Sequence, residues 1–196
     1  IDEMLKRMQL DYIDLLYVHQ PVGDFVGAWK DMEKAVKMGK VRALGISNFD
    51  ANDEVWNTIM KEAAIKPQVL QMECHPYAQR VDMRKKAAAE GIQVECWFPL
   101  GGAMSNGALF KDPVIKKIAE AHGKTPAQVI LRWHIQEGFS IIPGASNPDY
   151  IKENIQIFDF ALTDEEMQQM RSLNKEQRFF NATLEDVERM VGGARL

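Results

Sequence analysis

The sequence has little cysteine, no long apolar run and no surplus of basic charge. Cys74 and Cys96 are the only cysteines among 196 residues, and neither lies in a CxxC motif, which excludes a disulfide scaffold and a four-cysteine zinc site. No apolar run approaches the roughly 20 residues that span a bilayer. The net charge is −4, from 24 Lys and Arg against 28 Asp and Glu, so nucleic acids and membranes are poor candidate partners. We expect a cytoplasmic protein without a signal peptide.

Short apolar runs that predict strands alternate with amphipathic segments that predict helices. Each run is apolar on both faces, which is typical of a parallel sheet covered by helices. The predicted strands are residues 12–18, 41–46, 69–73, 92–97 and 139–142. The predicted helices are residues 26–38, 52–64, 80–90, 112–121, 125–136, 149–154 and 163–173, with a last one opening after Thr183.

Two α/β architectures fit this alternation within a single domain over residues 1–196. One is an open, doubly wound sheet, which five strands would complete. The other is a (β/α)8 barrel, which takes about 250 residues, so this chain would supply only five of its eight units. The pattern of apolar residues does not distinguish the two.

Polar, aromatic and small residues follow the predicted strands, where parallel α/β folds place their chemistry. The segments read HQP at 19–21, SNF at 47–49, QMECHPY at 71–77, WFPLGG at 97–102 and PGASN at 143–147. An imidazole, an amide pair, an aromatic face and a small-residue turn before a helix suit a planar ring that carries an amide, together with a phosphate. A nicotinamide dinucleotide presents these groups.

These segments resemble successive signatures of the aldo-keto reductases. They read LDYIDLLYVHQP, GKVRALGISNF, QMECHPY, WFPLGG and IIPGASNPDYIKEN, in order over residues 10–154, with a similar tail to residue 180. The bacterial branch that resembles diketogluconate reductases and prostaglandin F synthases is the nearest in appearance. The resemblance implies a parallel (β/α)8 TIM barrel, of which this chain supplies about five βα units plus the C-terminal tail. It also implies NADPH or NADH as cofactor and a small-molecule carbonyl substrate, an aldehyde or ketone reduced to an alcohol.

The resemblance also implies a role for each matching residue. His19 matches the catalytic histidine that orients and polarises the carbonyl, and Gln20 and Phe98 match substrate-binding positions. Trp97 matches the aromatic ring that stacks on the nicotinamide. The other matches to cofactor-binding positions are Ser47, Asn48 and Gln71, which hold the carboxamide, and Pro99, Leu100, Gly101, Gly144, Ala145, Glu153 and Asn154.

The sequence departs from the family in its catalytic tetrad of Asp, Tyr, Lys and His. The first three precede the histidine, but only 18 residues precede His19, and none of Tyr12, Tyr17, Tyr77 and Tyr150 matches the acid. We therefore expect an N-terminally truncated piece of a larger enzyme, which puts the activity of the isolated chain in doubt. Exposed barrel edges would favour self-association. The alternative is a non-catalytic cofactor-binding or regulatory fragment.

A second departure concerns the choice of cofactor. NADPH-specific members of the family carry Lys, Ser and Arg where this chain has Gly144, Ala145 and Tyr150. A 2′-phosphate carries about −2 charge and needs basic partners, so NADH use is expected. Lys152 lies about 200° around the predicted helix from Tyr150.

No metal site is predicted. Glu73, Cys74 and His75 resemble metal ligands, but the segment after the third strand is better explained as a structural turn. His122 and His134 lie on predicted helices, at the surface or in packing contacts.

Overall fold

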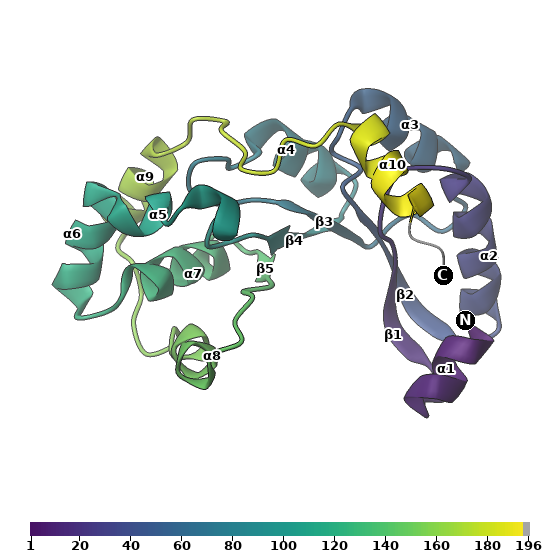
Figure 1. Cartoon of the computed structure of the whole chain (residues 1–196), viewed down its shortest axis with the longest axis horizontal. Coiled ribbons are helices and arrows are strands. Elements are labelled where there is room, and N and C mark those ends of the chain that lie inside the picture. Colours follow the sequence, from purple (N-terminus) through teal and green to yellow (C-terminus); the bar gives the residue numbers. More distant parts are fainter. Residues whose placement is uncertain (194–196) are drawn as a thin grey trace. The chain divides into compact units, whose positions relative to one another are not determined.

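A computed structural model of the chain describes residues 1–193, in which strands and helices alternate (Figure 1). The strands are β1 (Ile13–Val18), β2 (Val41–Ser47), β3 (Val69–Glu73), β4 (Gln93–Trp97) and β5 (Ser140–Ile141). The pairs β1–β2, β2–β3 and β4–β5 are all parallel. The predicted parallel α/β alternation is confirmed, with strand ends that differ by at most one residue.

Most helices were predicted as well, and the exceptions are short. The longer helices are α2 (Phe25–Lys37), α3 (Asp53–Glu62), α4 (Val81–Ala89), α6 (Pro113–His122), α7 (Pro126–Gln136), α8 (Pro148–Ile155), α9 (Asp164–Ser172) and α10 (Leu184–Gly193). The short ones are α1 (Asp2–Met8), the 3-10 turn η1 (Ala103–Ser105) and α5 (Ala108–Lys111). η1 and α5 are too short to show an apolar period, so no pattern in the sequence predicts them. None of the helices in the described part of the chain is both long and apolar enough to cross a membrane.

The chain divides into two compact units. Unit 1 contains Ile1–Met72, Lys86–Gln93 and the described residues from Ala182 onward. Unit 2 contains Glu73–Lys85 and Val94–Asn181. The organisation of the chain as a single domain stays a prediction.

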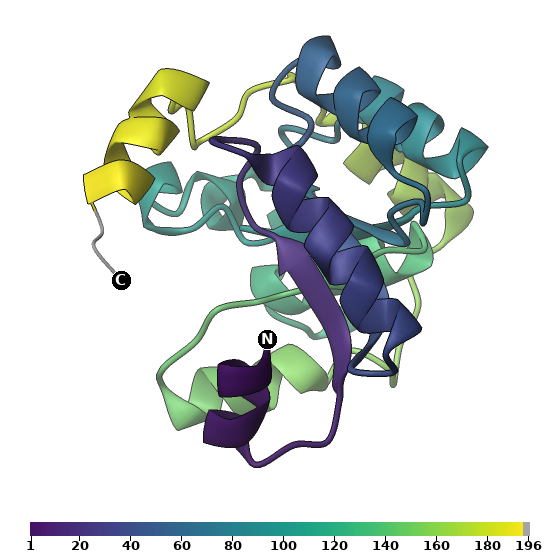
Figure 2. The ribbon, with the colours of Figure 1, turned by 90° about the vertical axis from the view of Figure 1, so that its right-hand side faces the viewer.

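Unit 1 is built on β1, β2 and β3, with α2 alongside β1 (Figure 2). Leu44, Ile46, Ile59 and Leu70 are fully buried, and burial of each such side chain contributes about 2 kcal/mol. The register pairs Val18 with Ile46 and Ser47 with Gln71. The carboxyl ends of the three strands therefore lie side by side.

A buried carboxylate fastens α2 to the segment that precedes β3. Glu33 is 6% exposed, and its Oε1 accepts hydrogen bonds from the Trp29 indole N–H at 3.0 Å and from the Ile65 backbone N–H at 2.8 Å. The Trp29 N–H also reaches the Ile65 carbonyl oxygen at 3.1 Å. Both donors share one oxygen of Glu33, so one acceptor atom makes the connection.

Unit 2 packs α6, α7 and α9 around an apolar core (Figure 1). The starts of these helices follow their sequence signals. Thr125 and Thr163 each form a capping box with the residue three positions on, as predicted for residue 163, and such caps stabilise a helix by about 1 kcal/mol. The core residues are Tyr77, Leu109, Ile115, Ile118, Ala119, Val129, Ile130, Trp133, Leu162, Met167, Met170 and Leu173.

The phenol of Tyr77 gives unit 2 a dependence on alkaline pH. Its hydroxyl donates to Asp112 Oδ2 at 2.7 Å, and burial, followed by this hydrogen bond, raises the pKa of Tyr77 to about 12. Its unfolded pKa is about 10, so this contribution to stability is fully present below pH 10 and is lost as the pH rises through 12. We expect Tyr77→Phe to remove about 2–3 kcal/mol of the fall in unfolding free energy between pH 9 and 12.

Urea unfolding at several pH values measures this effect. Tyr12 is 42% exposed, so Tyr12→Phe is the matched control and should keep the parent's pH profile. Equal alkaline slopes in the parent and in Tyr77→Phe would contradict the assignment.

Candidate functional site

A polar network joins the carboxyl ends of the strands in unit 1. The hydroxyl of Ser47 is buried and donates to Gln71 Oε1 at 3.2 Å. The side-chain amide of Asn48 donates to Ser47 Oγ at 3.2 Å and to the backbone oxygen of His19 at 3.3 Å. The structure thus brings together His19, Ser47, Asn48 and Gln71, which the sequence had placed after three different strands.

The backbone of Asn48 explains how the network turns toward His19. Its φ is 64°, in the left-handed region that asparagine tolerates better than most residues. Its N–H donates to the Gln71 carbonyl at 2.9 Å. In this conformation the side chain of Asn48 reaches both Ser47 and the backbone of His19. The hydroxyl of Ser47 and the amides of Asn48 and Gln71 together offer donors and acceptors that can pair with a carboxamide. The imidazole of His19 is exposed and Gln20 is half-buried beside it.

An aromatic group lies at the end of β4 in unit 2. The ring of Trp97 meets Phe98 at 4.7 Å and Phe180 at 5.6 Å between centroids, both edge-on. A Cβ at Gly102 would lie 2.9 Å from three atoms of the Phe98 ring, so this ring rests directly on the glycine backbone. Phe98 itself has a φ of 51°.

Phe179 precedes Phe180 in the C-terminal segment 174–180, which we call the tail. The ring of Phe179 covers the loop after β4. This ring stacks on His75 at 4.6 Å with an interplanar angle of 26°. A Cβ at Gly101 would lie 3.1 Å from the same ring and 2.8 Å from the Cβ of Ser105. Gly101 has a φ of 83°. This loop therefore accepts only glycine at both positions, and the predicted Pro99 beside it is buried.

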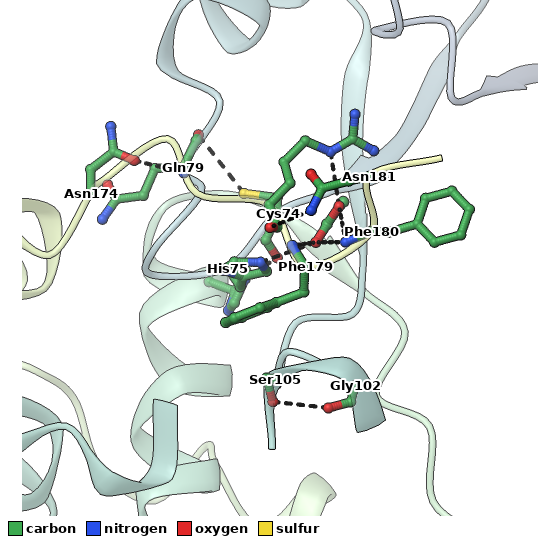
Figure 3. Close-up of polar contacts among 12 residues, drawn as sticks. Cys74, His75, Gln79, Gly102, Ser105, Asn174, Phe179, Phe180 and Asn181 are labelled. Carbon is green, nitrogen blue, oxygen red and sulfur yellow. Dashed lines mark hydrogen bonds and ion pairs between the residues drawn. The ribbon is translucent and has the colours of Figure 1, made fainter. Parts of the chain in front are cut away.

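A buried carboxylate, Glu73, holds the tail in place. Figure 3 shows Phe179 of the tail against His75. The side chain of Glu73 is fully buried and accepts hydrogen bonds from Arg178 Nε at 2.9 Å, from Phe179 N at 2.7 Å and from Phe180 N at 3.2 Å. His75 Nε2 lies 3.2 Å from the same carboxylate. Burial alone would raise the pKa of Glu73, but the hydrogen bonds from His75, Arg178 and Phe179 outweigh it and hold the pKa below its ordinary value.

A cavity of about 490 Å³ opens elsewhere in unit 2, near the start of α8. Five residues that the sequence assigned to cofactor binding line it: Leu100, Gly144, Ala145, Glu153 and Asn154. Phe110, Thr125 and Tyr150 also contribute to the wall. Its volume lies in the range of small-molecule sites.

The described lining of this cavity contains no Lys or Arg, and its charged residue is an acid. Glu153 Oε1 accepts a hydrogen bond from the Thr125 hydroxyl at 2.5 Å. Lys152 lines a different hollow, with Pro143, Pro148 and Ile155. The cavity therefore offers no fixed cation to a phosphate group.

Cys74, Cys96 and His134 form a fully buried group whose candidate ligand atoms lie within 4.8 Å of one another. Both nitrogens of His134 already face backbone oxygens, of Ile130 at 2.8 Å and of Cys74 at 3.1 Å. A hydrogen bond from Cys96 and the neighbouring His134 lower the pKa of the Cys74 thiol to about 5, although burial opposes them. Because both nitrogens of His134 already face backbone oxygens, the imidazole has no free nitrogen to offer a metal ion.

The contacts of the tail are the part of the site that the sequence does not predict. In the sequence, Glu73 resembles only a metal ligand, and no motif gives Phe179 or Phe180 a role. A glutamate at the end of an apolar strand does indicate a buried acid that needs partners. Its partners lie about 105 residues further along the chain, beyond the reach of a local pattern.

Most of the chain is similar to known proteins. The model of the aldo/keto reductase family matches residues 1–175. Glyoxal reductase of Bacillus subtilis is 42% identical over 178 residues, which cover 90% of this chain and 62% of that protein. Morphine 6-dehydrogenase of Pseudomonas putida is 42% identical over 187 residues and is covered to the same extent, 62%. The chain thus spans about three fifths of the curated relatives it matches.

Solved structures agree with these relatives. An aldo-keto reductase from a Medee basin deep-sea metagenome library superposes with a TM-score of 0.86 at 33% identity, over 92% of this chain and 66% of that one. A Brucella melitensis aldo/keto reductase gives 0.80 at 36% identity, over 88% and 65%. The predicted fold class, part of a parallel (β/α)8 barrel, is confirmed, and the open doubly wound sheet is excluded.

Proposed function

Because the chain belongs to the aldo/keto reductase family, we propose that it carries the cofactor-binding side and the histidine of a nicotinamide-dependent carbonyl reductase. The observation that carries the proposal is the cavity in unit 2, since five residues assigned to the cofactor from the sequence line it together. We assign this cavity to the adenosine end of the cofactor. The Ser47–Asn48–Gln71 network is assigned to the carboxamide, because its hydroxyl and amides complement that group.

The residues of this chain bind and orient rather than complete the reaction. The bound dinucleotide supplies the hydride that is added to the carbonyl carbon of the substrate. The imidazole of His19, exposed at the end of β1, donates an N–H hydrogen bond to the carbonyl oxygen and so polarises the bond. The proton for that oxygen comes from a tyrosine in this family, and no tyrosine of this sequence matches it. A second candidate is a non-catalytic protein that binds the cofactor without turnover.

We further propose that the chain accepts NADH. The residues that replace Lys, Ser and Arg of NADPH-specific relatives, Gly144, Ala145 and Tyr150, all line the cavity. With Glu153 also in the wall, a 2′-phosphate of about −2 charge meets an acid and no base.

Calorimetric titration of the purified chain with 5′-ADP and with NADH tests the cavity. Ala145→Trp fills it and should abolish binding of both, whereas Ala161→Trp, at an exposed position outside the cavity, should bind like the parent. We expect 2′,5′-ADP to bind the parent no more tightly than 5′-ADP. If the parent binds neither ligand, or if Ala145→Trp binds both unchanged, the adenosine assignment is wrong. Binding of NADH without oxidation in the presence of an aldehyde would favour the non-catalytic candidate.

A further inference from the structure

We propose that Glu73 is a positioning residue for cofactor binding, because it fixes the rings of Phe179 and Phe180 against Gly101 and Trp97. The inference rests on the proposed function, since it takes Trp97 as the ring on which the nicotinamide stacks. It goes further by giving the tail a defined task and by naming the residue that enforces it. Figure 3 shows the tail residues around the end of β3.

The carboxylate of Glu73 satisfies several hydrogen-bond donors of the tail at once. An ionised carboxylate accepts about four hydrogen bonds, and here Arg178, Phe179 and Phe180 all donate to it. The amides of Phe179 and Phe180 both donate to Oε1, so glutamine could keep its oxygen there and would lose only the bond from Arg178. Leucine at this position would leave both buried amides without an acceptor, which is costly.

Two of these donors are the backbone amides of Phe179 and Phe180. The backbone amides that Glu73 holds belong to the two residues that carry the rings. Phe179 is stacked on His75 and lies over Gly101, and Phe180 meets the edge of Trp97. Holding the two amides therefore sets the ring positions directly.

The contacts of Glu73 with residues 178–180, which we call the clamp, are distinct from the contacts that hold the rest of the tail. Upstream, the N–H groups of Lys175 and Gln177 both donate to the carbonyl of Tyr77 at 3.0 Å. Asn174 Oδ1 accepts from the backbone N–H of Gln79 at 3.0 Å. Residues 174–177 are thus anchored without Glu73. Loss of the Glu73 carboxylate should therefore release Phe179 and Phe180, while α9 and its core contacts stay in place.

The test compares Glu73→Leu with Glu166→Leu in the full chain. Glu166 is a matched control because it too is a carboxylate beside a histidine, His122 at 2.9 Å, and belongs to unit 2 without a hydrogen bond to Arg178, Phe179 or Phe180. We expect NADH to bind Glu73→Leu about tenfold more weakly than the parent, because both ring-bearing residues lose their acceptor. Glu166→Leu should keep the parent's affinity although it lowers stability.

A second variant keeps the inference testable if Glu73→Leu does not fold. Phe180→Leu retains the backbone amide and removes the ring, so it should also weaken NADH binding and alter the near-ultraviolet circular dichroism of Trp97. Parent-like affinity in both Glu73→Leu and Phe180→Leu would overturn the role in cofactor binding.

Amide hydrogen exchange separates failure of the clamp from failure of the proposed function. If the parent does not bind NADH, the proposed function fails for this chain, but exchange at Phe179 and Phe180 still reports on the clamp. Protection of these two amides in the parent and its loss in Glu73→Leu supports the clamp. Fast exchange in the parent, or equal protection in both proteins, overturns it.

Discussion

Replacing Gly144 by lysine and Tyr150 by arginine will shift the preference of the chain toward NADPH by about 100-fold. Both positions line the cavity in unit 2, whose described lining contains no basic residue. Each new cation can make a charge-assisted bond to a 2′-phosphate, worth about 1.5 kcal/mol, and none to the hydroxyl that NADH has instead. The quantity to measure is the ratio of the dissociation constants for NADH and NADPH, by calorimetry.

Two controls make this result specific. Lys152→Gln removes a charge from the same helix but from a different hollow, so it should leave the ratio unchanged. The gain in the double variant should shrink as salt rises, because charges at a partly open site are screened. An unchanged ratio in Gly144→Lys/Tyr150→Arg would show that the 2′ position of the ribose does not lie at this cavity.

Glu33→Leu will lower the free energy of unfolding by about 3 kcal/mol, whereas Glu33→Gln will lower it by less than about 1 kcal/mol. Both donors to Glu33, from Trp29 and Ile65, end on the same oxygen, and glutamine can place its carbonyl oxygen there. Leucine fills the space but leaves the Ile65 N–H without its acceptor.

Chemical denaturation of the three proteins gives these differences directly. The exposed pair of Lys30 and Glu62, at 3.5 Å, provides the control, since Glu62→Gln should change stability by less than about 0.5 kcal/mol. If Glu33→Gln and Glu33→Leu are equally destabilised, the shared-oxygen geometry is wrong.

The long elements could be predicted because each carries its own local signal. The segment 69–73 carries apolar residues at Val69, Leu70 and Met72 and is followed by polar and aromatic residues, so the predicted strand coincides with β3. The capping box formed by Thr163 and Glu166 predicts the start of α9. By contrast, η1 and α5 span three and four residues, too few for a periodic pattern. β5 is only two residues long, although the apolar run extends over four.

The candidate site divides along a similar line. The residues at the carboxyl ends of strands, such as Ser47 and Gln71, could be assigned because parallel strands bring these ends together. The links between Glu73 and Arg178, or between Thr125 and Glu153, join residues far apart in sequence. Pairings of this kind depend on tertiary packing, and single-sequence patterns do not contain them. The roles of His19, Trp97 and the other assigned residues stay predictions until variants are measured.

The positions of the tryptophans have a consequence for following the folding of the chain. Trp29 and Trp56 are buried in unit 1, and Trp133 and the half-buried Trp97 belong to unit 2. Each unit therefore carries its own pair of optical reporters. Chains that retain tryptophan in only one unit would show separate denaturation midpoints if the units unfold independently, and one shared midpoint if they unfold as a single cooperative body.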